Sequence, residues 1–501
     1  MATEHLDVLI VGAGLSGVAA AYYLQTRCPR KRYAILEARD EIGGTWDLFR
    51  YPGVRSDSDM HTLGYSFRPW PERKAIADGP AIRTYVRETA AAFGIDRNIR
   101  FQRHVRRIAW STDEARWTVD VEQGPEREPG QLTCSFLFMC TGYYEYDHGY
   151  LPEWPDFARY EGRVVHPQAW PPDLDYAGKR VVVIGSGATA VTLVPALAER
   201  AASIVMLQRS PTYIVSRPSV DVISDWLRRR LPIRMADQMT RWKNIALGMY
   251  FYWLTRRRPE RVRATLLQLT REQLGPEYDG VERDFSPRYN PWDQRLCLAP
   301  DGDFYNAIRA GKASVVTDEI AAFTARGVRL ASGRELPADI IVTATGLRMR
   351  LMAGVEILVD GEVVDLARTL AYKGAMFSGV PNLALAIGYT NASWTLKCEL
   401  IGGYVCRLLN YMDLHGYAAC VAPRPADVAN DELAMTLTSG YVERARAWLP
   451  RQGTRWPWRA VNNYAKDVMI LKLGAVNDGV MRFSRAERPA RVGVLGSMDK
   501  K

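Results

Sequence analysis

Leu6-Asp-Val-Leu-Ile-Val11 runs directly into Gly12-Ala-Gly14-Leu-Ser16-Gly17 and then into the segment VAAAYYLQTR, and this stretch decides the fold. The apolar, β-branched run predicts a buried strand, the glycines a tight turn, and the following segment a helix. In such a unit the first glycine permits the turn, the second lets backbone approach a pyrophosphate, and the third lets helix pack on strand. Helix amides then bind the anion. We therefore expect a dinucleotide site at Gly12, Gly14 and Gly17.

The next apolar run supports this interpretation. Tyr33 to Leu36 ends in Glu37, which stands at the expected distance of about 20 residues after Gly17 to bind a ribose hydroxyl. A lone glycine motif also occurs in unrelated turns. With strand, helix and acid all in register, the pattern favours a nucleotide site.

A second unit of the same kind follows far downstream. Lys179-Arg-Val-Val-Val-Ile184 repeats the strand, and Gly185-Ser-Gly187-Ala-Thr-Ala190 repeats the turn before another helical segment. The next predicted strand, Ser203 to Leu207, ends in Gln208-Arg209, where an NAD site would present a carboxylate. An arginine there accommodates a 2′-phosphate. The first unit thus favours FAD and the second NADPH, unless Arg209 is only an exposed charge at a strand end.

Two further apolar strands end in the same dipeptide. Phe136-Leu-Phe-Met-Cys leads into Thr141-Gly142, and Asp339-Ile-Ile-Val-Thr-Ala leads into Thr345-Gly346. Glycine at such a strand end lets backbone come close to a cofactor. The recurrence predicts two related domains.

Between the two units lies Tyr160-Glu-Gly162-Arg-Val-Val-His166-Pro-Gln-Ala-Trp170-Pro171. It resembles the F-x-G-x-x-x-H-x-x-x-W-P signature of class B flavoprotein monooxygenases, specifically Baeyer–Villiger monooxygenases, with tyrosine in place of phenylalanine. The resemblance runs nearly end to end. By it, Gly162, His166 and Trp170 are signature residues at a hinge, and Trp170 favours this family over related N- and S-oxidising enzymes.

Residues 43–60 and 290–297 resemble one branch of that family, the thioamide-activating (ethionamide) monooxygenases of mycobacteria, whose relatives oxidise ketones and sulfides. The resemblance, with the first motif, places FAD against Gly12, Gly14, Ser16, Gly17, Glu37, Gly44, Thr45, Trp46, Asp47, Leu48, Asp57, Val105 and Thr141. It places NADPH against Arg55, Ser56, Asp57, Gly185, Ser186, Gly187, Ala188, Thr189, Ala190, Gln208 and Arg209.

The resemblance also implies the chemistry. NADPH reduces FAD, O2 adds to the reduced flavin as a C4a-peroxide, and oxygen passes to a ketone, a sulfide or a thioamide. Arg295 matches the family's active-site arginine and Asp57 the carboxylate that positions it. A guanidinium stays charged and stabilises an anionic peroxide; without the family match, a structural salt bridge would be the simpler interpretation. Gln294 replaces a lysine common among relatives, so selectivity for NADPH over NADH stays open.

Chain order predicts an α/β fold with two Rossmann-like dinucleotide-binding domains, for FAD and NADPH, and a helical insertion in the NADPH domain. We expect the insertion to cap the active site or else to supply plain core, and Trp394 to line the substrate cavity. The predicted boundaries are 1–143 and 351–485 for the FAD domain, 144–210 and 287–350 for the NADPH domain, 211–286 for the insertion, and 486–501 for a basic tail.

The net charge of +10 fits a phosphate-rich cofactor, a membrane surface or a nucleic acid, and we expect no nucleic-acid partner. Arginine clusters at 228–230 and 256–258 fit either a solvated helix face or peripheral membrane contact. The beginning of the chain lacks a basic signal-like segment, and the apolar runs are shorter than the ~20 residues of a spanning helix. We therefore expect a cytoplasmic protein, with peripheral membrane attachment and oligomeric state open.

Seven cysteines without a C-x-x-C pair argue against structural disulfides and against a disulfide reductase, which needs a redox pair beside its flavin. Six histidines without ligand spacing predict no metal site. The remaining alternative is a non-catalytic nucleotide-binding sensor or membrane-surface flavoprotein that uses the same fold.

Overall fold

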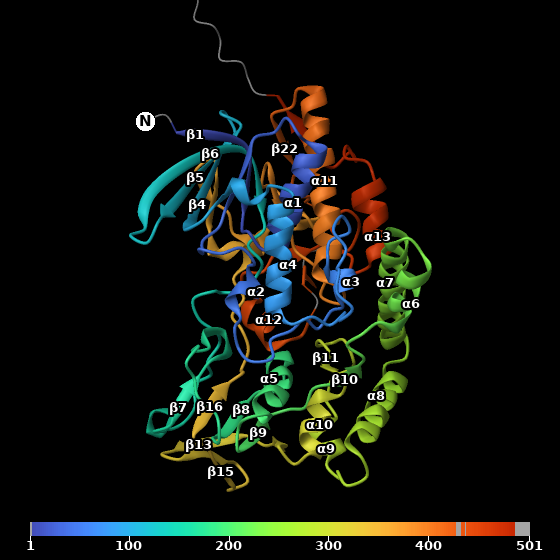
Figure 1. The fold of residues 1–501 in the computed structure, drawn as a ribbon. Coiled ribbons are helices and arrows are strands. Elements are labelled where there is room, and N and C mark those ends of the chain that lie inside the picture. The colour runs from blue at the N-terminus through green and yellow to red at the C-terminus, as the bar shows by residue number, and fades with distance from the viewer. Residues whose placement is uncertain (1–2, 427–431, 436, 486–501) are drawn as a thin grey trace, which may run out of the picture.

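The computed structural model describes residues 3–426, 432–435 and 437–485, and two sheets with parallel strands form its upper and lower halves (Figure 1). The upper sheet has the strand order β18-β17-β4-β5-β6-β1-β2-β3, and β21 also pairs with β6. Its strands are β1 (Glu4–Val11), β2 (Tyr33–Leu36), β3 (Ile99–Arg100), β4 (Arg103–Ser111), β5 (Arg116–Gln123), β6 (Glu128–Met139), β17 (Glu356–Val359), β18 (Glu362–Val363) and β21 (Leu383–Leu385).

The lower sheet has the order β12-β9-β8-β16-β7, and every neighbouring pair is parallel. Its strands are β7 (Arg163–Val165), β8 (Arg180–Ile184), β9 (Ser203–Gln208), β12 (Ala313–Thr317) and β16 (Ile340–Thr343). The helices after the two glycine turns are α1 (Leu15–Arg27) and α5 (Ala188–Ala198). The predicted α/β class with two strand–turn–helix units is confirmed.

β1 shows why the deciding stretch is apolar at almost every position. Val8 and Ile10 pack into a core with α1 and α11 (Trp394–His415), whereas Leu9 and Val11 pack into a second core against Trp117 of β5. Both faces of the strand are buried, as in most parallel sheets. Successive side chains of β1 therefore point alternately into two cores, and neither face of the strand meets solvent.

The insertion is mainly helical and runs beside both sheets (Figure 1). Its elements are β10 (Ile214–Arg217), α6 (Val222–Arg230), α7 (Ile233–Arg257), α8 (Pro259–Leu274) and α9 (Val281–Phe285). Strand β10, which the sequence pattern did not predict, pairs in parallel with β11 (Cys297–Pro300). A four-residue strand gives too short a pattern to be recognised.

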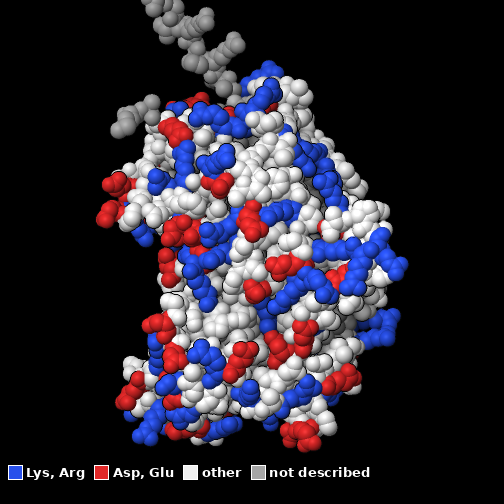
Figure 2. Space-filling view, in the orientation of Figure 1, with Lys and Arg blue, Asp and Glu red and all other residues white. Residues whose placement is uncertain are grey.

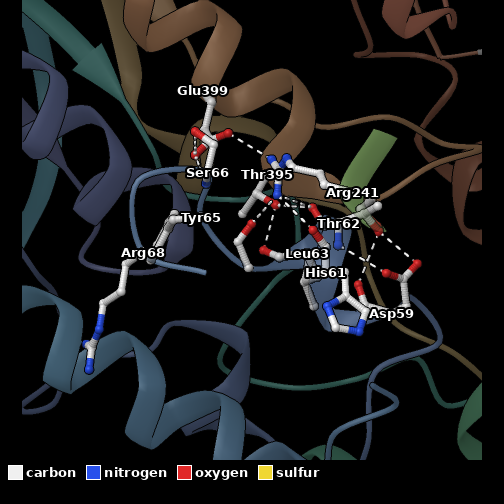
Figure 3. A network of polar contacts seen from close by, with 12 residues as sticks. Asp59, His61, Thr62, Leu63, Tyr65, Ser66, Arg68, Arg241, Thr395 and Glu399 are labelled. Atoms are coloured by element: carbon white, nitrogen blue, oxygen red, sulfur yellow. Dashed lines mark hydrogen bonds and ion pairs between the residues drawn. The ribbon is translucent and has the colours of Figure 1, made fainter. Parts of the chain in front are cut away.

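A buried polar cluster joins α7 to the upper half of the molecule (Figure 3). Arg241 forms an ion pair with Glu399 of α11 at 2.9 Å, and both side chains are nearly buried. Arg241 also donates to the carbonyl oxygens of His61 and Gly64, at 3.0 and 2.7 Å, and so caps the C-terminal end of α3 (Met60–Leu63). Glu399 accepts from the Ser66 amide and hydroxyl. The insertion is thus fixed to the upper half of the molecule by charge.

The remaining elements, apart from the 14-residue helix α4, are short. They are α2 (Thr45–Leu48), α4 (Gly79–Ala92), α10 (Asp303–Arg309), α12 (Gly440–Ala445), α13 (Tyr464–Asp467), a π-helix at Val468–Leu473, β13 (Ile320–Thr324), β14 (Gly327–Leu330), β15 (Glu335–Pro337), β19 (Ala371–Tyr372), β20 (Met376–Phe377), β22 (Ala419–Val421), β23 (Glu432–Leu433), β24 (Arg451–Gln452), β25 (Arg482–Ser484) and 3-10 turns at Asp96–Asn98, Phe157–Arg159, Pro167–Ala169, Leu351–Gly354 and Leu366–Arg368. The predicted tail at 486–501 lies outside the described residues, and the domain boundaries stay a prediction. Among the described residues, no helix combines the length and hydropathy that crossing a bilayer requires.

Candidate functional site

One cavity of about 1190 Å³ is lined by both glycine turns. Gly12 and Gly14 line it from the upper sheet, and Gly185 and Gly187 from the lower one. Both turns stand at carboxyl ends of parallel strands, where ligands of α/β folds bind. The volume exceeds the ~300–1000 Å³ typical of a pocket for one small molecule. Two nucleotides and a substrate therefore fit the architecture.

The glycines of the first turn have two roles: some are needed for close packing of the fold, and others leave space beside the cavity. Gly12 has a φ of +105°, and a Cβ there would lie 2.5 Å from the Cys140 carbonyl oxygen. A Cβ at Gly17 would lie 1.9 Å from the Gly12 oxygen, whereas one at Gly14 would come no closer than 3.5 Å, to the Gly44 Cα. Gly12 and Gly17 are needed for packing. Gly14 and Gly44 leave room beside the cavity.

Glu37 is suited to a ribose. It lines the cavity at the end of β2 with a 5% exposed side chain. Its Oε2 accepts from the Ala13 amide at 2.7 Å and its Oε1 from the Arg39 amide at 2.9 Å. Burial raises the pKa of this carboxyl, although the two amide contacts and the Arg39 charge oppose the rise. Each oxygen keeps a lone pair for a ligand hydroxyl.

Asp47 behaves differently from the other residues predicted to contact FAD. Its fully buried carboxylate pairs with Arg39 at 2.6 Å, Arg50 at 2.8 Å and Arg83 at 3.1 Å. Burial acts to raise its pKa, but the arginines outweigh burial and hold the pKa below its usual value. Asp47 does not line the cavity, and neither do Gly17 and Leu48. Asp47 instead fixes Arg39, which does line it.

The glycines of the second turn have the same two roles. Gly185 has a φ of +132°, and a Cβ there would lie 2.2 Å from the Ala344 oxygen. A Cβ at Gly187 would meet nothing within 4 Å. Because Gly187 also lines the cavity, its missing side chain leaves open space where a pyrophosphate can approach.

The two residues after β9 point to different places. Arg209 is exposed, lines the cavity, and forms no hydrogen bond or ion pair with any described residue. The Gln208 side chain is buried, and its Nε2 donates to the Asp284 carbonyl oxygen at 2.7 Å and to Thr317 Oγ1 at 2.8 Å. Gln208 and Ala190 do not line the cavity, and their contact with NADPH stays a prediction.

The predicted catalytic pair meets inside the cavity. Arg295 Nη1 lies 3.7 Å from Asp57 Oδ2, and both side chains are about one-third exposed, at 34% and 35%. Arg295 Nη2 donates to the Tyr389 carbonyl oxygen at 3.5 Å, whereas its buried Nε has no partner among the described residues. The side chain lines the cavity and stays about one-third exposed, so the guanidinium can contact an anionic ligand there.

Aromatic residues surround this pair. Tyr143 stacks on Trp394 with ring centroids 5.2 Å apart, and its hydroxyl lies 2.7 Å from that of Tyr144. Trp394 Nε1 donates to Ser16 Oγ at 2.8 Å and lines the cavity as expected. Tyr441 of α12 completes the wall. The three tyrosines were not predicted from the sequence, because a six-residue helix and an irregular linker carry no periodic signal.

The signature residues His166 and Trp170 do not line the cavity. His166 Nε2 lies 3.3 Å from the Gly346 carbonyl oxygen, and Gln168 Nε2 donates to the carbonyl oxygens of Glu145 and Tyr146, both at 2.9 Å. Residues 143–150 and 346–350 connect the two sheets and pair with each other through the bridge Tyr144–Met349. Gly149 leaves room for the His166 ring, since a Cβ there would lie 1.9 Å from it. Trp170 packs in the lower core.

The expectation that the insertion caps the active site is wrong. Of residues 211–286, only Pro211 and Thr212 line the cavity. The helices lie further out because the inner face of α7 is bound to Asp59, to the carbonyl oxygens of His61 and Gly64 and to Glu399, none of which lines the cavity. Pocket shape is set by the linkers and by α12.

All seven cysteines are buried and free, and no group of acidic, histidine or cysteine side chains in the part of the chain that the structure describes is arranged to hold a metal ion.

Comparison with known proteins agrees with the family that the sequence motifs indicate. Residues 6–227 match the family model described as flavin-binding monooxygenase-like. The chain is 56% identical to the FAD-containing monooxygenase EthA of Mycobacterium tuberculosis, covering 98% of this chain and 100% of that protein. It is 52% identical to EthA of Mycolicibacterium smegmatis, covering 96% and 98%.

Solved structures show the same fold. An oxidized steroid monooxygenase bound to NADP matches with a TM-score of 0.75 at 21% identity, covering 96% of this chain and 100% of that one. A mutant cyclohexanone monooxygenase of Rhodococcus sp. Phi1 bound to NADP⁺ matches with a TM-score of 0.74 at 20% identity, with the same coverage.

Proposed function

Because this chain belongs to the family of FAD-containing, flavin-binding monooxygenases, we propose that it uses NADPH and O2 to insert oxygen into a small ketone, sulfide or thioamide. The observation that supports this most is the partly exposed guanidinium of Arg295, positioned beside Asp57 in a cavity shared by both glycine turns. A non-catalytic sensor has no use for a positioned guanidinium in an aromatic pocket.

The residues present fit both cofactors. We propose that FAD lies along Gly12, Gly14, Ser16, Glu37, Gly44, Thr45, Trp46, Asp57, Val105 and Thr141, with Gly17, Asp47 and Leu48 in supporting positions. For NADPH we propose Arg55, Ser56, Asp57, Gly185, Ser186, Gly187, Ala188, Thr189 and Arg209, with Ala190 and Gln208 packed behind them. All residues in the first part of each set line the cavity.

When bound, FAD supplies two-electron chemistry, so that one oxygen atom of O2 reaches the substrate and the other leaves as water while NADPH is oxidised. The chain supplies the surroundings. Arg295 places a permanent positive charge where negative charge develops on oxygen, Asp57 holds its orientation, and the tyrosines with Trp394 keep water away.

We further propose that the substrate is small and uncharged. An aromatic wall near Arg295 offers hydroxyls but no carboxylate; it consists of Tyr143, Tyr144, Tyr441 and Trp394. This lining suits a ketone, sulfide or thioamide with an apolar body. The division of the chain into domains and a hinge at His166 are also proposals, supported by the two sheets and by the linkers that His166 and Gln168 contact.

Arg209→Ala is expected to raise KM for NADPH roughly 10- to 100-fold, because a charge-assisted hydrogen bond contributes about 1.5–3 kcal/mol. KM for NADH should stay the same, since NADH carries no 2′-phosphate. Gln294→Lys is the complementary variant and should lower KM for NADPH. Steady-state kinetics with both cofactors measures this. An unchanged KM for NADPH in Arg209→Ala means that the second turn was misinterpreted.

Gly187→Ala should leave folding and FAD content intact and yet weaken NADPH binding, because the new methyl group meets no protein atom within 4 Å and enters the cavity. Gly248→Ala is the matched control, since that helical glycine also has open space around it but lies outside the cavity. We expect a rise in the Kd of NADP⁺ in the first variant only. Equal affinities in the two variants would remove the proposed path of the pyrophosphate.

FAD content provides the test against the non-catalytic alternative. The purified protein should carry one FAD, and NADPH should bleach its visible absorbance under anaerobic conditions. A flavin that stays oxidised in excess NADPH would favour the sensor.

A further inference from the structure

Helix α7 turns an unusually polar face toward the protein. Four side chains of this face form ion pairs or hydrogen bonds: Asp237 with Arg228 at 2.8 Å, Arg241 with Glu399 at 2.9 Å, Lys243 with Asp221 at 2.6 Å and Asn244 with Asp59 at 2.9 Å. A surface helix of a globular protein normally turns its apolar face inward. Ile245, Phe251 and Leu254 do pack inward against small apolar clusters, but the large side chains of Trp242, Tyr250 and Trp253 lie on the outer side.

The outward face carries a continuous apolar stripe. Met235, Met239, Trp242, Ala246, Tyr250 and Trp253 are all exposed and follow one another at spacings of three or four residues. At 1.5 Å per residue the stripe is about 27 Å long. Trp242, Tyr250 and Trp253 are each more than half exposed, at 56%, 59% and 54%. Side chains of this size cost free energy when left in water.

The stripe is the centre of a larger apolar surface. Half of the exposed large hydrophobic residues in the described part of the chain lie between Val222 and Trp253, so they are concentrated and not scattered. Trp226 of α6 belongs to this group. On the other side Trp242 contacts Tyr464 of α13, which leads to the exposed Met469 and Leu473. We call the stripe on α7, together with Trp226, Tyr464, Met469 and Leu473, the α7 surface.

Positive charge flanks the α7 surface. Exposed arginines stand at both ends of α7, and exposed lysines lie in and after α13; these are Arg229, Arg230, Arg234, Arg256, Arg257, Arg258, Lys466 and Lys472. Figure 2 shows Lys and Arg gathered beside uncharged atoms along the edge formed by α6 and α7.

We propose that the α7 surface docks the enzyme on a bilayer of anionic phospholipids, with α7 lying in the plane of the interface. Tryptophan and tyrosine prefer the headgroup boundary, and arginines and lysines are attracted to anionic lipid. Two copies of this chain joined face to face through the same surface would bring like charges together, which disfavours a dimer there. The paired inner face keeps α7 on the protein while its outer face meets lipid.

The test is sedimentation of the FAD-loaded enzyme with vesicles of phosphatidylcholine alone or with one-quarter phosphatidylglycerol. The wild type should sediment with the anionic vesicles, and less so as salt rises. The triple variant Trp242→Ser, Tyr250→Ser, Trp253→Ser should bind them at least about tenfold more weakly. The control variant Leu151→Ser, Val363→Ser, Leu414→Ser removes three exposed hydrophobic residues elsewhere and should bind like the wild type.

NADPH oxidation by both triple variants shows that they are folded, since none of these residues lines the cavity. Light scattering without lipid measures the oligomeric state. A wild type that ignores anionic vesicles, or a stripe variant that binds them as well as the wild type does, overturns the proposal. Loss of a wild-type dimer in the stripe variant, without vesicle binding, would assign the surface to a second copy.

Discussion

Arg295→Ala is expected to lower product formation about 100- to 1000-fold while NADPH is still consumed and its reducing equivalents appear as hydrogen peroxide. The magnitude is that of removing one preorganised electrostatic donor from an active site. Arg295 is the charge beside Asp57 within the tyrosine wall, and nothing in the geometry links it to the 2′-phosphate contact proposed for Arg209. Parallel assays of NADPH, peroxide and product give the coupling ratio that checks this.

Two further variants serve as comparisons for Arg295→Ala. Arg106→Ala removes another arginine that lines the cavity, one that pairs with Glu122 at 2.7 Å, and should leave the coupling ratio unchanged. Asp57→Asn keeps the guanidinium but loosens its orientation, so its loss should be intermediate. Normal coupling in Arg295→Ala would contradict the role given to this residue, and equal uncoupling in Arg106→Ala would show that the charge acts without specificity.

Arg241→Met is expected to cost about 3–5 kcal/mol of stability, the usual penalty for leaving one partner of a buried ion pair without the other. Glu399 would keep only its contacts with Ser66, and the carbonyl oxygens of His61 and Gly64 would lose their donor (Figure 3). The midpoint of chemical denaturation, followed by tryptophan fluorescence, measures the change.

The double variant Arg241→Met, Glu399→Leu should be more stable than Arg241→Met alone, because no uncompensated charge is then buried. Arg180→Met is the exposed control; its pair with Asp339 is about half exposed and should contribute roughly 0–1 kcal/mol. A cost for Arg241→Met no larger than that of Arg180→Met would show that the cluster does not hold the insertion in place.

The features that could be predicted from sequence are local ones. A glycine turn, its strand and its helix occupy consecutive residues, so both units, Glu37 and the α/β class were predicted, and the structure with its relatives confirms the class, the family and the flavin monooxygenase function. Arg295 and Asp57 are 238 positions apart and were connected only through the family resemblance. Their 3.7 Å contact agrees with that connection.

The features that could not be predicted depend on the third dimension. The aromatic residues of α7 have ordinary helical spacing, and a period alone does not tell which face turns inward. Ion pairs occupy much of the inner face of α7, and Trp242 and Trp253 are exposed on the outer face. The insertion therefore does not cover the cavity and contributes only Pro211 and Thr212 to its lining. Gln208 shows the same limit at one residue: its position after β9 was right for a cofactor contact, but its amide is bound to Asp284 and Thr317.

The central claim is tested most directly by following NADPH, O2 and product together when the FAD-loaded enzyme is given a phenyl ketone or an aryl sulfide in air. The account predicts that ester or sulfoxide forms in step with NADPH oxidation, with one NADPH and one O2 used for each product. NADPH oxidation that yields peroxide alone with every ketone, sulfide and thioamide offered, or no oxidation at all, would contradict it.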